Sequence, residues 1–503
     1  LSALIMILSG CTEQVKGLDL GLGAEKNQGV SNPEIEDEGP SQGGFLRLFM
    51  LEPDTLNPLT TDNLTVRQLS SFVFDGLFCL NGDGTVEGAL VDHYVFSGDG
   101  LILDMDLRDQ IFFHDGRMLS SDDVVYTVES IKNAGERSLY RGNVAGIQSI
   151  RALDRLSIRI ILKKPDIPLK KFTFPIVPEH RWKDQAAGEP AEDFRPVGTG
   201  PFKFDSYADD RITLLRNDSW WSTKASGGLK HPIWLDGIVF RVFRDGAEMM
   251  QAFQRKEIDI AYFSDGNLED YINRSDIFFK QYESNILEFL ALSGLGRRNS
   301  PVSQEDFRAP LIRYLGWYGA MNPINKGKSA LDDLDGTPSG TETTREDIMD
   351  SFKAAGFTYH EDRNLLMFYR NGARVPVALT LRYNERDGDR QEVSEWIKTA
   401  LSEIGIQVVP ETASGTEQQA SVKSGKFDMM LLGYRLPLFS DKAEALESIQ
   451  KSVNLSGENH VILPLYRKYG TAMYSTRIRG PKMPLWDSIY NGWSEWYILQ
   501  KLK

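Results

Sequence analysis

The chain has 503 residues, enough to bury a large core and to form two to four domains. Acidic residues outnumber basic ones by 71 to 57, which gives a formal net charge of −14. This balance argues against a nucleic-acid partner, because phosphate neutralisation requires clustered Lys and Arg side chains.

The chain starts with a short apolar run, Leu1 to Leu8, that ends in the motif Leu8-Ser9-Gly10-Cys11. This motif is typical of a lipobox, so residues 1–11 are interpreted as signal peptide and lipobox, with Cys11 as the lipid-carrying N-terminus. The basic segment that normally precedes such a run is absent, and a short apolar run also fits a strand or the end of a core helix. No later segment approaches 18 uninterrupted apolar residues, so lipid on Cys11 is the only membrane attachment that the sequence predicts.

Residues 12–44 are rich in Gly and acidic residues and show neither a helix nor a strand period. Such a segment buries too little apolar surface to offset its chain entropy, so it predicts a flexible tether. A domain outside the cytoplasmic membrane is expected to follow it.

From Phe45 onward, strand and helix patterns alternate. Apolar runs between Gly and Pro turns predict strands, and apolar residues at helical spacing predict helices. The Ser and Asp residues at 120–123 also supply a helix N-cap. The predicted strands span 45–51, 101–107, 156–162, 212–215, 237–242, 258–262, 286–292, 375–383, 406–409 and 427–432. The predicted helices span 65–74, 120–133, 247–253, 345–355 and 390–404. This alternation predicts α/β lobes, with a loop over 323–343.

Signals for catalysis and for metal binding are weak. The six histidines include no pair at the spacing of a zincin helix, and the sequence displays no nucleophile–base pair. Asp332-Asp333-Leu334-Asp335-Gly336 fails the calcium-loop pattern, because Leu331 stands at the first ligand position. Cys79 lies in an apolar run, where a small buried thiol is expected. We therefore expect no enzyme activity, no catalytic residue, no metal ligand and no cofactor.

Several short motifs occur together in a characteristic order. They are Asp54 to Pro58, Asp75 to Phe78, Leu107-Arg108, Phe113 to Gly116, Ser121 to Val124, Val197 to Phe202, Ile258 to Ile260, Ala354 to Phe357, Leu401 to Val408, Gly425 to Asp428 and Pro464 to Tyr466. With this ordered set, which covers most of residues 45–490, the chain resembles the family 5 solute-binding proteins of ABC importers. That group contains oligopeptide- and dipeptide-binding proteins.

The resemblance implies a periplasmic-binding-protein-like fold, with two α/β lobes joined by a hinge and a solute held between them. Lobe I is expected over 45–284, with an extra subdomain at about 66–184. A shortened lobe II is expected over 285–463, and residues 464–503 return to lobe I. The implied partners are a peptide or other small solute and an ABC permease with its ATPase, and the chain is expected to be a monomer.

Candidate ligand-binding residues lie where predicted strands end at the expected cleft. Aromatic, amide and hydroxyl groups suit a site that encloses a peptide-like solute, although packing at the cleft rim explains each of them equally well. The candidates are Thr55, Asn57, Tyr262, Phe263, Ser264, Tyr383, Asn384, Gly433, Tyr434 and Arg435.

The sequence departs from the oligopeptide binders in two places. Those proteins have an Arg before a Gly-Trp pair and, beyond it, an Asp that binds the α-amino group of the peptide. Leu431 and Pro437 stand at these positions here, and Tyr434 replaces the Trp. A buried ammonium without a carboxylate is costly, so we expect no free peptide N-terminus there, whereas Arg435 suits a carboxylate-bearing solute. The stretch from Gly433 to Pro464 is also shorter than is usual in the family.

Three functions follow as hypotheses. The first is a lipid-anchored protein that captures a solute outside the cytoplasmic membrane and delivers it to a membrane permease. The second is a transport-inactive sensor or partner-binding lipoprotein of the same fold, which the shortened second lobe favours. The third is an extracytoplasmic hydrolase, for which the sequence offers no catalytic pair.

Overall fold

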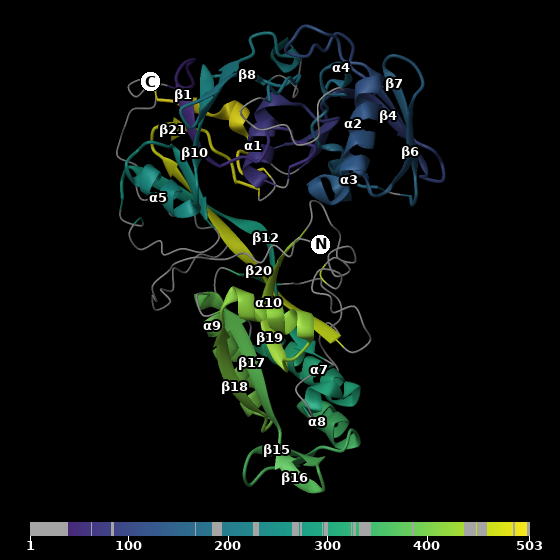
Figure 1. Cartoon of the computed structure of the whole chain (residues 1–503), viewed down its shortest axis with the longest axis vertical. Helices are drawn as coiled ribbons and strands as arrows, with labels where there is room; N and C mark the ends of the chain where they lie inside the picture. The colour runs from purple at the N-terminus through teal and green to yellow at the C-terminus, as the bar shows by residue number, and fades with distance from the viewer. Residues whose placement is uncertain are drawn as a thin grey trace. The chain divides into compact units, whose positions relative to one another are not determined.

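The computed structural model describes residues 39–499 with internal gaps at 62, 82–84, 166, 184–193, 225–230, 264–270, 272–273, 294, 296–299, 323, 325–327, 331–343, 385–386, 437–448, 450–459 and 486–487. The described residues divide into two compact units (Figure 1). Unit 1 comprises residues 283–469, and unit 2 comprises residues 39–263, 268–282 and 470–499. The strands β12 (Ile277–Ser293) and β20 (His460–Ser475) each contribute residues to both units.

Unit 2 contains a four-stranded sheet in the order β1-β10-β9-β8. Its strands are β1 (Phe45–Leu51), β8 (Phe202–Ala208), β9 (Arg211–Arg216) and β10 (Gly237–Phe243). β1 runs parallel to β10, whereas β8, β9 and β10 are antiparallel neighbours. The helices α1 (Leu64–Val73) and α5 (Gly246–Gln254) pack against this sheet. Asn63 caps α1, because its side chain accepts a hydrogen bond from the backbone of Thr65 at 2.9 Å.

A second four-stranded sheet of unit 2 has the order β4-β5-β7-β6. It is formed by β4 (Val91–Phe96), β5 (Ile102–Leu107), β6 (Ile147–Ala152) and β7 (Ser157–Leu162). Helix α2 (Ser121–Ala134) lies along it (Figure 1) and begins with a capping box of Ser120 and Asp123. The shorter elements of unit 2 are β2 (Phe78–Leu80), β3 (Val86–Gly88), α3 (Arg141–Val144), α4 (Glu179–Trp182), β11 (Ile260–Phe263), β21 (Ile478–Arg479) and β22 (Tyr497–Ile498).

Unit 1 is built on three parallel strands, β17 (Ala378–Asn384), β18 (Gln407–Ala413) and β19 (Met429–Arg435). β12 pairs antiparallel with β19, and β20 follows β12 in the sheet order. The helices are α7 (Glu305–Met321), α8 (Arg345–Ala354), α9 (Gly388–Ser402) and α10 (Gly415–Ser424). Three further strands form a small sheet, β14 (Thr358–His360), β15 (Leu365–Arg370) and β16 (Ala373–Pro376), and β13 (Lys328–Ala330) pairs with β20.

The core of unit 1 lies where these helices meet the sheet. Leu379 and Leu381 of β17 pack with Ile397 of α9 and with Tyr314 of α7, all fully buried. After α9 the chain turns through Gly405, whose φ is +75°. A Cβ there would lie 2.6 Å from the backbone nitrogen of Leu366, so only glycine fits this turn.

Most predicted elements are confirmed within one or two residues, including β1, α2, α8 and α9. The predicted strand over 375–383 is wrong in one respect. The chain forms two strands there, β16 and β17, which are interrupted between Pro376 and Ala378 and pair in different sheets. The predicted loop over 323–343 contains the short strand β13. Helix α7 was not predicted.

In unit 2 a buried carboxylate joins three segments that are distant in the sequence. Asp259 is fully buried and accepts hydrogen bonds from the Arg47 side chain at 2.6 and 3.2 Å and from Arg477 at 2.7 Å. Its backbone N–H donates to the carbonyl of Arg47 at 2.7 Å, and its carbonyl accepts from Ser475 at 2.8 Å. These bonds hold the returning chain after β20 against β1.

Replacing this carboxylate tests whether Asp259 stabilises the docking of the returning chain against β1. We expect Asp259→Asn to destabilise the protein by roughly 3 kcal/mol, because it leaves two arginines without their buried counter-charge. Urea unfolding followed by tryptophan fluorescence measures the loss. Asp109→Asn is the matched control, since Asp109 and its partner Arg155 are about half exposed and such surface pairs stabilise little. Equal unfolding midpoints for the two variants would contradict the assignment.

Candidate binding cavity

Unit 2 contains a cavity of about 700 Å³, a volume typical of small-molecule sites. Its walls come from segments that are distant in the sequence: α1, the β2–β3 hairpin, residues 220–222 and residues 488–495 of the returning chain. Aromatic side chains dominate several of these walls. They are Phe74, Phe78, Tyr140, Trp220, Trp221, Tyr490 and Trp493.

A buried carboxylate orients two of these aromatic rings. Asp75 Oδ2 accepts hydrogen bonds from the indole N–H groups of Trp220 at 3.3 Å and Trp221 at 2.9 Å, and from the Thr199 hydroxyl at 2.9 Å. Burial raises the pKa of Asp75, although the three donors oppose this effect. Because both indoles donate to one oxygen, their rings are fixed before any solute arrives. Trp220 also stacks with His231.

Charged side chains of both signs line the same cavity. Lys482 and Glu495 form an ion pair at 2.9 Å, with both side chains about half exposed. Arg67 of α1 and Glu87 of β3 line it as well. A solute in this cavity therefore meets aromatic surface together with fixed positive and negative charges.

Cys79 also lines the cavity and is partly exposed, which corrects the expectation of a buried thiol. Burial of its sulfur and the nearby charge of Glu87 raise the pKa of Cys79 to about 12. The thiol therefore stays protonated at neutral pH and is a poor nucleophile.

His114 holds two turns of unit 2 together. Its Nδ1 accepts from the backbone N–H of Gly198 at 3.3 Å, and its Nε2 lies 3.0 Å from the carbonyl of Gly200. This arrangement requires a neutral ring with the proton on Nε2. Burial lowers the pKa of His114 to about 4. A Cβ at Gly198 would lie 2.0 Å from the Val73 carbonyl, so these glycines serve close packing.

The depressed pKa of His114 predicts acid sensitivity. Between pH 6.5 and 4 the His114 ring is protonated in the unfolded chain but neutral in the folded protein. The free energy of unfolding therefore falls as the pH drops through this window. Between pH 7.5 and 4.5, the free energy of unfolding of the His114→Asn variant should fall by about 2–3 kcal/mol less than that of the wild type. Denaturant midpoints at several pH values measure this difference. Parallel pH curves for the two proteins would refute the role of His114.

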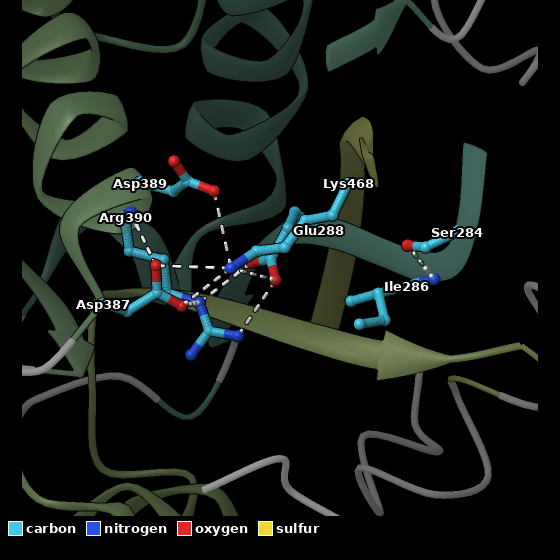
Figure 2. A network of polar contacts seen from close by, with 7 residues as sticks. All are labelled: Ser284, Ile286, Glu288, Asp387, Asp389, Arg390 and Lys468. Carbon is cyan, nitrogen blue, oxygen red and sulfur yellow. Dashed lines mark hydrogen bonds and ion pairs between the residues drawn. The ribbon is translucent and has the colours of Figure 1, made fainter. Parts of the chain in front are cut away.

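Unit 1 contains a buried cluster of charges at the start of α9 (Figure 2). Glu288 of β12 is 2% exposed and binds Arg390 at 2.9 and 3.2 Å. Lys468 of β20, which is 3% exposed, lies 3.2 Å from Asp387, 3.6 Å from Asp389 and 3.8 Å from Glu288. Burial opposes ionisation of Asp387, but the charges of Lys468 and Arg390 outweigh burial and lower its pKa. The cluster anchors α9 to two strands.

Gly433 of β19 lies directly against this cluster. It pairs with Glu288 across the two strands, and a Cβ at this position would lie 2.5 Å from Glu288 Oε1 and 2.6 Å from an Arg390 nitrogen. The absence of a side chain at Gly433 therefore makes room for the ion pair.

Comparison with known proteins shows what this chain is similar to. The profile of the bacterial extracellular solute-binding proteins, family 5 (middle region), matches residues 85–310. The oligopeptide-binding protein AppA of Bacillus subtilis is 22% identical over 445 residues, which cover 82% of this chain and 78% of that protein. The dipeptide-binding protein of Escherichia coli is 22% identical over 423 residues, with 76% and 74% covered. The middle part of this chain, residues 85–310, is thus similar to family 5 of the bacterial extracellular solute-binding proteins.

Comparison with a solved structure shows the fold. The ABC transporter substrate-binding protein CtaP of Listeria monocytogenes superposes with a TM-score of 0.66 at 18% identity, over 92% of this chain and all of that one. The two-lobed α/β fold of periplasmic binding proteins, expected from the sequence, is therefore confirmed. Among the described residues no helix is long and apolar enough to cross a membrane.

In unit 2 the first candidate ligand-binding residues make local contacts. The Thr55 hydroxyl accepts from the backbone of Asn57 at 3.1 Å, and the Asn57 side chain accepts from Leu59 at 2.9 Å, so both shape their own loop. The Tyr262 hydroxyl donates to Gln68 at 2.9 Å, and Gln68 lines the cavity. The backbone of Phe263 ends β11.

In unit 1 the remaining candidates gather at the carboxyl ends of parallel strands. Tyr383 and Asn384 end β17 and are 8% and 6% exposed. Gly433, Tyr434 and Arg435 end β19, where they pair with Glu288, Leu287 and Ile286. Leu431, which stands where oligopeptide binders have an Arg, is buried in the apolar core. The predictions at Cys11, Ser264, Asp332 to Gly336 and Pro437 lie outside the described residues.

The sequence prediction missed the side chains that line the cavity. The consecutive indoles Trp220-Trp221 and the single acid in the apolar run Phe74-Asp75-Gly76-Leu77-Phe78 were available signals. Another pattern is accidental: Gly39-Pro40-Ser41-Gln42-Gly43 has the spacing of a nucleophile elbow, but strand β1 rather than a helix follows it.

Proposed function

We propose that this protein is the solute-capturing component of an ABC importer. It binds a peptide or peptide-like small solute and delivers it to a membrane permease, without making or breaking a bond in the solute. The aromatic cavity of unit 2, with its two indoles fixed by Asp75, is the observation that carries the proposal. Two relatives, an oligopeptide-binding protein and a dipeptide-binding protein, support a peptide-like solute.

The described side chains offer little support for hydrolysis. Cys79 is held as a thiol by its raised pKa, and both ring nitrogens of His114 lie against backbone groups. Binding without turnover therefore fits this cavity better than nucleophilic catalysis does.

Solute binding is tested by thermal unfolding of the purified chain with di- to pentapeptides. At a hundredfold excess over Kd, a bound peptide stabilises the protein by about 2.7 kcal/mol, which raises the Tm by a few degrees. We expect Trp221→Ala to weaken binding at least about tenfold, because the ring packs at the solute's position. Tyr369→Ala, on an exposed residue of unit 1, is the control and should bind normally.

The outcomes separate the candidate functions. A panel of peptides and other small solutes that never shifts the Tm would reject solute capture and favour a transport-inactive sensor or partner-binding protein. The buried Leu431, in place of the Arg of oligopeptide binders, is the observation that keeps this alternative. Release of a cleaved product would instead support a hydrolase.

The second part of the proposal is a lipid anchor on Cys11. We expect the wild type expressed in a bacterial host to incorporate radiolabelled palmitate and to sediment with membranes. Cys11→Ser should abolish both the label and the sedimentation, while Cys79→Ser leaves both unchanged because it keeps Cys11. Label that persists in the Cys11→Ser protein would disprove this anchor.

A further inference from the structure

The charges that line the cavity of unit 2 differ in how they are neutralised. Lys482 and Glu495 pair with each other. Asp75 accepts three hydrogen bonds on one oxygen. Arg67 and Glu87, in contrast, have no oppositely charged side chain within ion-pair distance among the described residues, and they do not pair with each other. Within the part of the chain that the structure describes, one cavity therefore holds a positive and a negative side chain that lack an oppositely charged partner.

Arg67 is half-buried and oriented by an aromatic ring. Its guanidinium carbon lies 5.9 Å from the centre of the Tyr140 ring, and Tyr140 is 4% exposed. Arg67 also hydrogen-bonds the Tyr140 side chain, so the ring and its hydroxyl orient the guanidinium, whose five N–H groups exceed what one hydroxyl can accept. A planar guanidinium with two parallel N–H groups matches a carboxylate in a bidentate arrangement.

Glu87 comes from another wall of the cavity. It stands on β3 opposite Cys79 of β2 and accepts one hydrogen bond, from the Asn81 amide at 3.3 Å. An ionised carboxylate has about four acceptor positions, so Glu87 retains capacity for a cationic donor. A primary ammonium, with three N–H groups, suits such an acceptor.

Resting on the function proposed above, we propose that the solute is a zwitterion, with its carboxylate bound by Arg67 and its ammonium bound by Glu87. The indoles of Trp220 and Trp221 pack against its apolar middle. The physical reason is desolvation. A neutral solute that fills the cavity would strip water from both charges without replacing it, and a singly charged solute would do so for one of them. A solute with both charges compensates both.

This assignment moves recognition of the ammonium to unit 2. The sequence lacks the Asp that oligopeptide binders use near the Gly-Trp pair, with Pro437 in its place. Glu87 supplies a carboxylate from a different element. The specificity of this chain for zwitterions thus rests on Arg67 and Glu87.

The experiment uses three forms of each tripeptide Ala-X-Ala: free, N-acetylated and C-terminally amidated. Calorimetric titration of the full chain gives Kd for each form. We expect capping either end to weaken binding at least about tenfold, which corresponds to about 1.4 kcal/mol. Arg67→Gln should remove the difference between free and amidated peptides, and Glu87→Gln the difference between free and acetylated ones.

Matched controls separate charge recognition from general damage. Arg155→Gln and Glu129→Gln change the same residue types at exposed ion pairs of unit 2 and should keep both preferences. Arg67→Lys should keep part of the preference for a free carboxylate, which a misfolded cavity would not do. Equal binding of free and capped peptides to the wild type overturns the inference. Binding of neutral or singly charged solutes alone also overturns it. In both cases the proposed function stands. No binding of any solute rejects both.

Discussion

The fold of unit 2 depends on the buried carboxylate of Asp259. The chain leaves this unit through β12 and returns through β20, so unit 2 is closed only when its last segment docks. Asp259 fixes that docking by binding Arg47 of β1 and Arg477 of the returning chain together. The returning chain then supplies residues 488–495 as a wall of the cavity, with Trp493 against Trp220. The cavity of unit 2 is thus a consequence of long-range closure and not of a single local motif.

Buried charges serve two purposes in this protein. At Asp259 and Glu288 each carboxylate is matched by arginine or lysine, and the pairs hold distant segments together. A buried charge of this kind stabilises only when its partner is present, because desolvation is costly. Arg67 and Glu87 differ, since the described residues leave them without counter-charges inside a cavity large enough for a solute. This contrast separates charges that stabilise the fold from charges that are available to bind a ligand.

The elements that the sequence predicts well are those specified by short-range signals. β1 follows from its run of apolar residues, and α2 follows from the capping box of Ser120 and Asp123. Helix α7 escaped prediction because Pro310 and two glycines obscure its pattern, whereas burial of Tyr314 and its neighbours stabilises it in the fold. The resemblance to family 5 was recognisable from ordered motifs. The cavity was not, because Arg67 looks like any helix-surface charge until distant segments enclose it.

The most direct test of the account is a crystal structure of the chain with a bound solute, obtained with the tightest ligand from the binding screen. We expect the solute to occupy the cavity of unit 2, to contact Trp221, and to place opposite charges against Arg67 and Glu87. A solute bound elsewhere, with this cavity closed by side chains, would contradict it.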